Sequence, residues 1–347
     1  MPSDCELLQR RVSMLTIQKG LPMRCTRVIL AVVTLIAASL PAAAQHWPAR
    51  PLSMVVPFAP GSASDTVGRI LGARLSEVLG QQVFIENIGG AGGMTGVARV
   101  AKALPDGYQF VLGGLDTFAQ NQTLYRNPLY NSATDFVPVA LMVEQPLVLL
   151  VRNELPVSNI KEFIAYAKMN QARMQYGSGG VGSTSHLACA QLNAAIGVDI
   201  THVPYRGSAQ AMQDLIAGRI DYFCALAAAA MPQIGSKTMK AIAVMTRDRS
   251  PLLPNLPSAH EQGLADFDSY SWFGFFLPRD TPAPIVTALH AGAVATMDTP
   301  SVAERLKGVG VTIVAPDRRS PEYLRKFLGS EIEKWATIIK SSGITLD

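Results

Sequence analysis

The stretch Met54–Gly80 constrains the fold of this chain more than any other. Met54–Val56 is a short apolar run of the kind that forms a buried parallel strand, and the Pro- and Gly-containing loop after it ends the strand. Asp65 is predicted to be the N-cap of a helix that ends at Gly80. A loop between a strand and a helix N-terminus exposes backbone N–H groups and the positive end of a helix dipole. The stretch therefore predicts a binding site for an anion, most naturally a carboxylate or a phosphate.

The same unit occurs twice more along the chain. Met174–Tyr176 precedes the loop Gly177–His186, and Ile200–Val203 precedes the loop Pro204–Ser208; a helical pattern follows each loop. The loops carry few full charges, and their hydroxyl groups belong to Ser62, Ser64, Ser178, Ser183 and Thr184. Such loops suit recognition of a small carboxylate by hydrogen bonds, without covalent chemistry.

Short apolar runs alternate with helical patterns, which predicts an α/β fold with mainly parallel strands. Val137–Leu141 and Pro146–Val151 are predicted to form one strand that leaves a first lobe, and Tyr270–Leu277 a strand that returns to it. We therefore expect lobe 1 to contain residues 45–148 and 271–347 and lobe 2 to contain residues 149–270, with a ligand cleft between them. Gly113–Asn121 is predicted to be a loop.

Residues 1–44 are predicted to be a leader rather than part of the fold. Arg24 and Arg27 precede the apolar run Val28–Leu40, and small residues precede Gln45. This is the pattern of a secretory signal peptide with cleavage after Ala44, and translation is expected to start at Met23. The mature chain is expected to be exported.

Removal of this leader changes the charge of the chain. It takes away five basic and two acidic residues, so the formal net charge falls from +4 to +1. No stripe of Lys and Arg remains that would indicate nucleic-acid binding. Of the four cysteines, Cys189 and Cys224 remain, both in apolar segments. Export would permit a disulfide, but we expect two buried free thiols. No Cys/His cluster has metal-site spacing, and no cofactor is expected.

Two other chemistries are weaker interpretations of the second loop. Gly177-x-Gly179-x-x-Gly182 fits a dinucleotide fingerprint, but NAD is not ordinarily available to an exported protein. Ser183 and His186 could belong to a hydrolase, with His202, His260, Asp65 or Asp221 as further members. The chain has no Gly-x-Ser-x-Gly elbow, and an i,i+3 spacing rarely aligns Ser with His for proton transfer.

Several single residues have two interpretations. Arg206 could pair with a ligand carboxylate or be an exposed loop residue. Asp221 could face the cleft or lie in a solvated turn. Trp272 and Phe273 could line the cleft, although we expect them in the core.

The motifs together identify a family. They are, in order, Trp47-Pro48-x-Arg50-Pro51, Val56-Pro57-Phe58-Ala59-x-Gly61 with Asp65, Val83–Gly93, Pro105–Tyr108, Tyr130 to Asp135-Phe136-x-Pro138, Tyr176–Gly179 with Gly182-Ser183 and His186, Val203-Pro204-Tyr205-x-Gly207, Pro257-Ser258 with Glu261-x-Gly263, and Trp272-x-Gly274. Over residues 47–340 the chain resembles the receptor component of tripartite tricarboxylate transporters, also called Bug or TctC-type receptors.

The resemblance implies a two-lobed type II periplasmic-binding-protein fold that closes on a small carboxylate: a di- or tricarboxylate, an acidic amino acid or an aromatic acid. Carried over by motif, the ligand-binding residues would be Phe58, Ala59, Gly61, Ser62, Asp65 and Thr117 in lobe 1, and Gly182, Ser183, His186, Tyr205 and Asp221 in lobe 2. Ser62 departs from the family loop, which usually has a second Gly there, so specificity cannot be copied from a relative.

The resemblance also implies a role. We expect a monomeric periplasmic receptor, not an enzyme, that delivers its ligand to the membrane permease of a tripartite tricarboxylate-type transporter. The alternatives are a sensor that presents its ligand to a membrane signalling protein, or an exported Ser/His hydrolase.

Overall fold

The structure is a computed structural model that describes residues 47–265 and 267–342. They belong to one compact unit, Trp47–Asp347. The predicted signal peptide, the start at Met23 and the cleavage after Ala44 lie outside the described residues. Within the described ranges, no helix has the length and apolar character needed to cross a membrane.

Ten strands of the described chain form a continuous sheet. Its order is β2 (Val83–Asn87), β1 (Leu52–Val56), β3 (Gln109–Gly114), β9 (Tyr270–Pro278), β4 (Phe136–Val151), β7 (Tyr222–Leu226), β5 (Gln175–Ser178) and β6 (Thr201–Pro204), while β8 (Lys240–Val244) and β10 (Thr312–Ile313) also pair with β4. The pairs β1–β2, β1–β3, β5–β6 and β5–β7 are parallel. The pairs that involve β4 or β9 are antiparallel.

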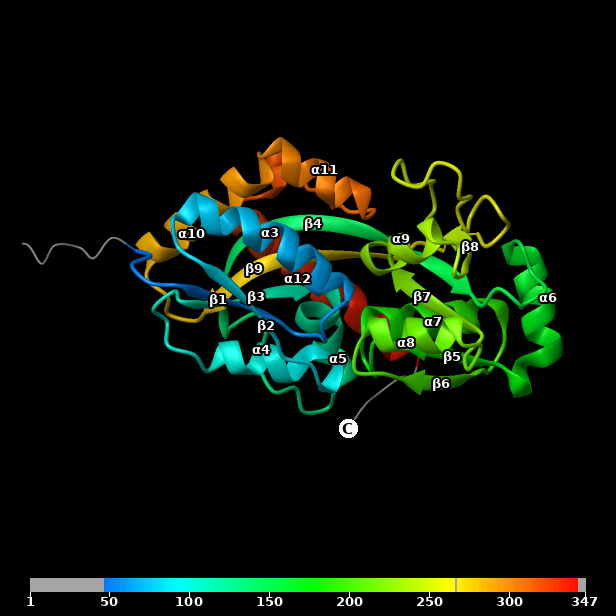
Figure 1. Ribbon diagram of the computed structural model, residues 1–347. Helices are drawn as coiled ribbons and strands as arrows, with labels where there is room; N and C mark the ends of the chain where they lie inside the picture. The colour runs from blue at the N-terminus through cyan, green and yellow to red at the C-terminus, as the bar shows by residue number, and fades with distance from the viewer. Residues whose placement is uncertain (1–46, 266, 343–347) are drawn as a thin grey trace, which may run out of the picture. The chain divides into compact units, whose positions relative to one another are not determined.

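The predicted single strand over 137–151 is confirmed as β4, and the predicted returning strand is confirmed as β9. The two strands pair from Phe136–Pro278 to Pro146–Tyr270, after which β4 pairs with β7 and β8. They thus run side by side from the β1–β3 region to the β5–β8 region (Figure 1). The chain passes from one group of parallel strands to the other close to residues 148 and 271, the predicted lobe boundaries. The division into lobes at those residues stays a prediction.

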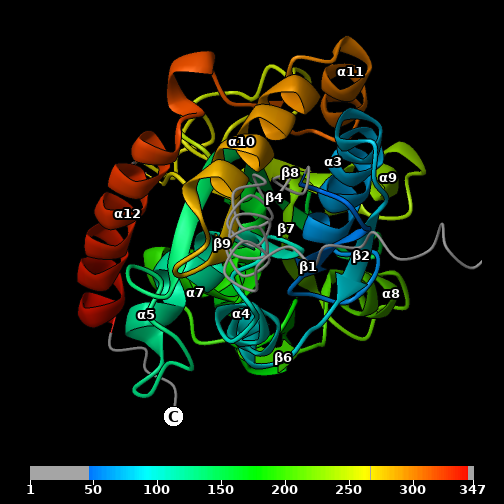
Figure 2. The ribbon, with the colours of Figure 1, turned by 90° about the vertical axis from the view of Figure 1, so that its left-hand side faces the viewer.

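The helices flank this sheet. They are α3 (Ala63–Leu79), α4 (Met94–Ala101), α5 (Asn121–Leu124), α6 (Ile160–Asn170), α7 (Thr184–Ile196), α8 (Ser208–Ile216), α9 (Ala227–Gly235), α10 (Ala283–Met297), α11 (Pro300–Gly308) and α12 (Pro321–Ser342), with short turns at Ala91–Gly93, Asp116–Gln120, Gln171–Arg173 and Pro316–Arg318. Helix α10 packs on α3 and β4, and α12 packs on β4 and α5 (Figure 2).

Helix α3 begins differently from the prediction. Its N-cap is Ser62, whose Oγ accepts the Asp65 N–H at 3.3 Å, so the prediction of Asp65 as N-cap is wrong. The Asp65 carboxylate instead reaches back to accept the Gly61 N–H at 2.9 Å. A carboxylate in the third helical position satisfies N–H groups ahead of the helix, as in a capping box. The predicted end at Gly80, in a left-handed conformation, is confirmed.

The prediction of a loop over Gly113–Asn121 is also wrong. Strand β3 continues to Gly114, and Asp116–Gln120 forms a π-helical turn that leads into α5. The apolar side chains of Leu115 and Phe118 are buried and hold this turn in the core. The small and polar residues around them concealed the helical spacing in the sequence.

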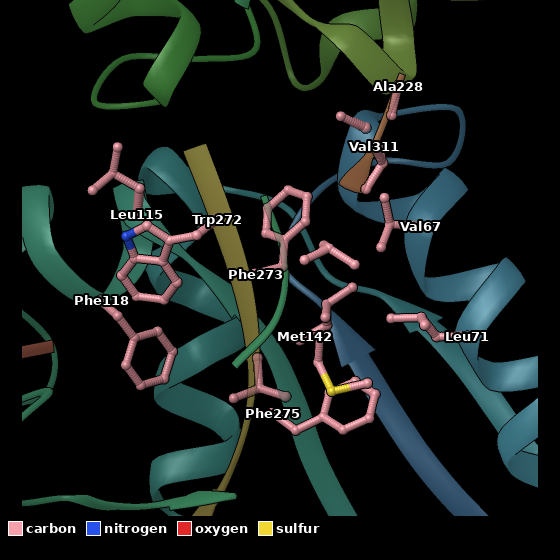
Figure 3. Packing of buried hydrophobic residues seen from close by; sticks show 14 of the residues in the cluster. Val67, Leu71, Leu115, Phe118, Met142, Ala228, Trp272, Phe273, Phe275 and Val311 are labelled. Atoms are coloured by element: carbon pink, nitrogen blue, oxygen red, sulfur yellow. The ribbon is translucent and has the colours of Figure 1, made fainter. Parts of the chain in front are cut away.

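The core between β9 and its neighbours contains large aromatic side chains. Trp272 and Phe273 are 0% and 2% exposed and point to opposite sides of β9 (Figure 3). Trp272 lies on the side of Phe118 and donates its Nε1–H to Glu331 at 3.1 Å. Phe273 lies on the side of Val67 in α3. Trp272 fills the core as expected, whereas Phe273 is buried and also lines the cavity described below.

Cys189 in α7 and Cys224 in β7 form a disulfide, so the expectation of two free thiols is wrong. Both residues are fully buried, and their Cα atoms are 5.5 Å apart. Their apolar surroundings are compatible with either state, and only the packing of α7 against β7 brings the sulfurs together.

We expect this disulfide to contribute substantially to stability. The double variant Cys189→Ala/Cys224→Ala should lose roughly 2–5 kcal/mol of unfolding free energy, because it releases the chain between the two residues in the unfolded state. Urea unfolding of the variant and the wild-type protein measures the loss. Mass spectrometry of denatured protein should show a gain of two hydrogens on reduction; an unchanged mass would contradict the bond.

Candidate functional site

A small buried cavity lies where several helices begin. Its volume is about 20 Å³. The lining residues are Phe58, Ser62, Ala63, Ser64, Asp116, Gly179, Ser183, Thr184, Ser185, Ser208, Leu226 and Phe273. They come from the loops after β1 and β5, the first turns of α3, α7 and α8, the π-helical turn after β3, the end of β7 and the middle of β9. Because these turns follow the carboxyl ends of parallel strands, the sheet itself brings them together.

The first turns of α3 and α7 present N–H groups and hydroxyls to this cavity. Ser62 caps α3 and Ser183 caps α7 in the same way, with Oγ accepting the N–H three residues later. Ser183 also donates to the carbonyl of Gly180 at 2.7 Å. The Thr184 hydroxyl has no hydrogen-bond partner although it is buried. A buried hydroxyl without a well-aligned partner is unfavourable. The Thr184 side chain lies close enough to Asp116 to lower the pKa of that carboxylate, so its hydroxyl can donate either to Asp116 or to a ligand.

Asp116 supplies the one carboxylate among the cavity-lining residues, and it is 3% exposed. Its Oδ1 accepts the Thr117 N–H at 2.7 Å and its Oδ2 accepts the Thr184 N–H at 3.4 Å. Burial raises the pKa of Asp116 to about 6, against the opposing effect of the Thr117 and Thr184 N–H donors and of the Thr184 side chain. Sequence reasoning missed this residue. Its position could have indicated a place in the site, because Asp116 follows the carboxyl end of β3, a strand parallel to β1.

A wider groove of about 590 Å³ lies beside the cavity and shares Phe58 and Gly179 with it. Its other lining residues are Gly90, Ala91, Gly92, Gly93, Gly180, Val181, Pro204, Tyr205, Arg206 and Gln210. Arg206 is exposed, and no ion pair involving it is seen among the described residues. The Tyr125 hydroxyl donates to the carbonyl of Val181, one of these lining residues, at 3.2 Å.

Of the predicted ligand-binding residues, Phe58, Ser62 and Ser183 line the cavity and Tyr205 lines the groove. Ala59 and Gly61 lie in the loop that meets the second predicted lobe. A Cβ added at Gly207 would lie 2.9 Å from the Ala59 Cβ, and one added at Gly61 would lie 3.1 Å from the Ala209 Cβ. The two loops are thus in contact.

Asp65, Thr117, Gly182 and His186 are not among the residues that line the cavity or the groove. The Asp65 carboxylate accepts hydrogen bonds from Gly61, Arg69 and Asn87. Burial acts to raise its pKa, but these hydrogen bonds outweigh it, so the pKa lies below its ordinary value. The Thr117 Oγ1 is bonded to the backbone of Gly114. These side chains shape the loops that carry the cavity.

His186 fixes the second loop as a neutral imidazole. Its Nδ1 accepts the Gly182 N–H at 3.2 Å, and its ring stacks on His202 at 4.0 Å. Burial lowers the pKa of His186 to about 4. Its side chain is therefore engaged with Gly182 rather than with the Ser183 hydroxyl.

Asp221 lies away from both spaces. It precedes β7, whereas Leu226 at the other end of that strand lines the cavity. Its carboxylate accepts hydrogen bonds from Arg152 at 2.9 Å and from the Gln175 N–H at 2.8 Å. The structure therefore does not bring Asp221 together with the other predicted residues.

Ser185, Ser208 and Leu226 also line the cavity and were not predicted. Ser185 and Ser208 lie in the first turns of α7 and α8, so attention to each helix start could have found them. No group of three or more His, Cys, Asp or Glu residues that could hold a metal ion occurs in the described part of the chain.

A family model and a curated relative both match most of this chain. The family model described as "Tripartite tricarboxylate transporter family receptor" matches residues 67–344. A protein of Agrobacterium vitis, described as "UPF0065 protein in the TAR-I ttuE-ttuC' intergenic region", is 39% identical over 316 residues, which are 90% of each chain.

Three solved structures are similar over most of the chain. The periplasmic binding protein BugD is 37% identical with a TM-score of 0.83, covering 86% of this chain and 99% of BugD. MatC from Rhodopseudomonas palustris, solved with malate, is 36% identical with a TM-score of 0.81 and coverages of 84% and 100%. The R. palustris protein Rpa4515, solved with adipate, is 35% identical with a TM-score of 0.83 and coverages of 86% and 99%.

The raised pKa of Asp116 predicts a pH-dependent stability difference. The folded protein holds this proton more tightly than the unfolded chain, whose pKa is near 3.8. The stabilisation is complete below about pH 4 and is lost as the pH rises through about 6. The variant Asp116→Asn has no carboxyl group to ionise, so it does not lose stability in this way as the pH rises. Its unfolding free energy relative to wild type should therefore rise between about pH 4 and 7, by on the order of 3 kcal/mol.

Urea unfolding at both ends of this range measures the difference. Asp280→Asn is the control, since that side chain is 78% exposed. A difference between Asp116→Asn and wild type that does not change with pH would contradict the buried, proton-binding carboxylate.

Proposed function

This chain belongs to the tripartite tricarboxylate transporter receptor family, and from that premise we propose that it is a periplasmic receptor for a small carboxylate. The observation that carries the proposal is the meeting of the α3 and α7 N-termini at one buried cavity. Two relatives solved with malate and adipate support it.

The lining groups suit a carboxylate ligand. Helix N-termini stabilise negative charge through their free N–H groups and dipoles. The Thr184 hydroxyl adds a donor that has no partner in the structure. Phe58 and Phe273 provide apolar walls for the carbon skeleton of the ligand. Recognition would rest on hydrogen bonds, in keeping with a ligand that must later be released.

Closure of the two predicted lobes would trap the ligand. The loop at Ala59 and the loop at Gly207 belong to different lobes in this proposal, and they are in contact here. A ligand that touches both loops favours the closed arrangement over the open one, which is how binding shifts such an equilibrium. The closed form would then deliver the ligand to a membrane permease.

The geometry does not support Ser183 and His186 as the catalytic pair of a hydrolase. The Ser183 hydroxyl donates to Gly180, and His186 Nδ1 accepts the Gly182 N–H, so no Ser–His hydrogen bond for proton transfer joins these two residues. A sensor would use the same ligand site and differ in its membrane partner.

A ligand screen tests the proposal. Purified protein is refolded from denaturant to remove retained ligand and heated with malate, adipate, succinate, citrate, aspartate, glutamate, benzoate or glycerol. At about 1,000-fold excess over Kd, binding adds roughly 4 kcal/mol of stability, so one group of acids should raise the melting temperature by several degrees. The ligand should be recovered unchanged by NMR. Folded protein that responds to none of the acids, or that consumes its ligand, would refute the proposal.

Thr184→Val keeps the shape of the side chain and removes the hydroxyl. We expect affinity for the ligand found in the screen to fall about 5- to 30-fold, as for one lost hydrogen bond of roughly 1–2 kcal/mol. Thr337→Val is the control, since Thr337 is exposed on α12. Equal affinities of the two variants in calorimetry would remove Thr184 from the site.

Gly207→Ala tests closure. The added methyl group would lie 2.9 Å from the Ala59 Cβ, so the two loops must separate. Overpacking of roughly 1–3 kcal/mol would weaken binding about 5- to 150-fold while the ligand-free melting temperature stays close to wild type. Gly329→Ala is the control, because an added Cβ there meets no atom within 4 Å. Unchanged affinity would show that these loops need not meet.

A further inference from the structure

The one carboxylate that lines the cavity has no cationic partner. Asp116 is 3% exposed, and none of the ion pairs found among the described residues involves it. No Lys, Arg or His is among the described residues that line the cavity. Arg206 lines the neighbouring groove instead and is exposed. A ligand carboxylate at the N-termini of α3 and α7 would therefore bring a second negative charge to a space that already contains one.

The size of the cavity brings these two charges into contact. Its volume is about 20 Å³. A single buried water molecule needs about 10–15 Å³ of such space. The cavity therefore admits one small group, and a carboxylate there has no room for a layer of water or a metal ion between it and Asp116. Two carboxylates in contact cannot both remain ionised, so such a pair holds one proton between them.

The contacts of Asp116 are compatible with a protonated carboxyl group. Its Oδ1 accepts the Thr117 N–H at 2.7 Å, whereas the bond that Oδ2 accepts from the Thr184 N–H is long, at 3.4 Å. A protonated carboxyl group keeps acceptor capacity beside its O–H donor. The Thr184 side chain is a further donor to Asp116, and a hydroxyl can turn from Asp116 toward a ligand carboxylate. Burial raises the pKa of Asp116 to about 6, so about one molecule in ten already holds this proton at pH 7.

The other titratable groups around Asp116 keep their charge state near neutral pH. The Asp116 turn packs on α5, α12, β3 and the short turn before α4, and it contacts α7 through Thr184. At the end of α5 and in the segment after it, burial raises the pKa of Tyr125 and Tyr130. On α7, burial lowers the pKa of His186 to about 4. These three side chains therefore stay neutral between pH 6 and 8.

Helix α12 contributes one buried charged residue among its described positions, Glu331. Its carboxylate accepts the Trp272 Nε1–H at 3.1 Å and lies 3.8 Å from the Lys334 Nζ. Trp272 points to the side of β9 opposite to Phe273, which lines the cavity (Figure 3). Glu331 is thus paired away from the cavity, and Asp116 is the acidic group that a ligand there would contact.

We propose that Asp116 is a proton-binding site that is filled when the ligand binds, so that the receptor captures its carboxylate ligand together with one proton. This inference rests on the proposed function, which places a ligand carboxylate in the cavity. The proton comes from the solvent and binds to a carboxylate oxygen of Asp116, which then donates a hydrogen bond to the ligand carboxylate. No covalent bond to the ligand forms or breaks. Protonation converts a repulsive neighbour into a donor of a charge-assisted hydrogen bond.

Calorimetry measures this proton directly. Ligand-stripped wild-type protein is titrated at pH 7 with malate, adipate, succinate, aspartate and glutamate, in HEPES and in Tris, whose ionisation enthalpies differ. For each acid that binds, the difference between the two observed enthalpies gives the number of protons taken up. We expect about 0.9 proton per ligand, because Asp116 with a pKa of about 6 is mostly ionised at pH 7 before the ligand enters.

The dissociation constant should also depend on pH. In the wild-type protein, Kd should rise about tenfold per pH unit between pH 7 and 8.5, because an ionised Asp116 must take up a proton for each ligand bound. In Asp116→Asn the uptake should vanish and Kd should change by less than about twofold, since the amide has no proton to gain and donates an N–H of its own. Asp280→Asn is the control and should keep the wild-type slope, since that side chain is 78% exposed.

The outcomes separate the two proposals. Binding of an acid by the wild-type protein without proton uptake would overturn the role of Asp116 and leave the carboxylate receptor standing. Uptake that persists in Asp116→Asn would place the proton on another group or on the ligand, and would also overturn that role. Asp116→Ser, which likewise removes the carboxyl group, serves if Asp116→Asn does not fold. Binding of none of the acids to the wild-type protein would overturn both proposals.

Discussion

The antiparallel pairing of β4 with β9 is the interaction on which the rest of this structure depends. Strand β4 pairs first with β9 and then with β7 and β8, so one strand joins two groups of parallel strands. The carboxyl ends of β1 and β3 therefore lie near those of β5 and β7, and the helices that follow these strands begin around one cavity. Trp272, Phe273 and Phe275 in β9 are buried, so this crossing is also the centre of the core (Figure 3).

The second consequence of this arrangement is electrostatic. The cavity has many dipolar donors and one full charge, that of Asp116. Dipoles that are fixed by the fold bind an anion without the desolvation of a cationic side chain, so such a site can bind reversibly.

A layer of side chains behind the cavity keeps its loops in place. Asp65 accepts the Gly61 N–H, and His186 accepts the Gly182 N–H, so each loop has an acceptor in the first turn of its own helix. Both acceptors are buried within that turn. Motif comparison marks these residues alongside those that line the cavity, and the geometry separates the two roles.

The sequence by itself determined the strand–loop–helix units, the long β4 strand and the returning β9 strand, because apolar periodicity and Gly or Pro punctuation are local properties. It also marked Phe58, Ser62 and Ser183, whose loops follow apolar strands. Only the tertiary structure decided the disulfide between Cys189 and Cys224, the separation of Asp221 from the cavity and the presence of Asp116 within it. Each of these depends on which residues from distant parts of the chain face one another, and strand pairing sets that arrangement rather than any local pattern.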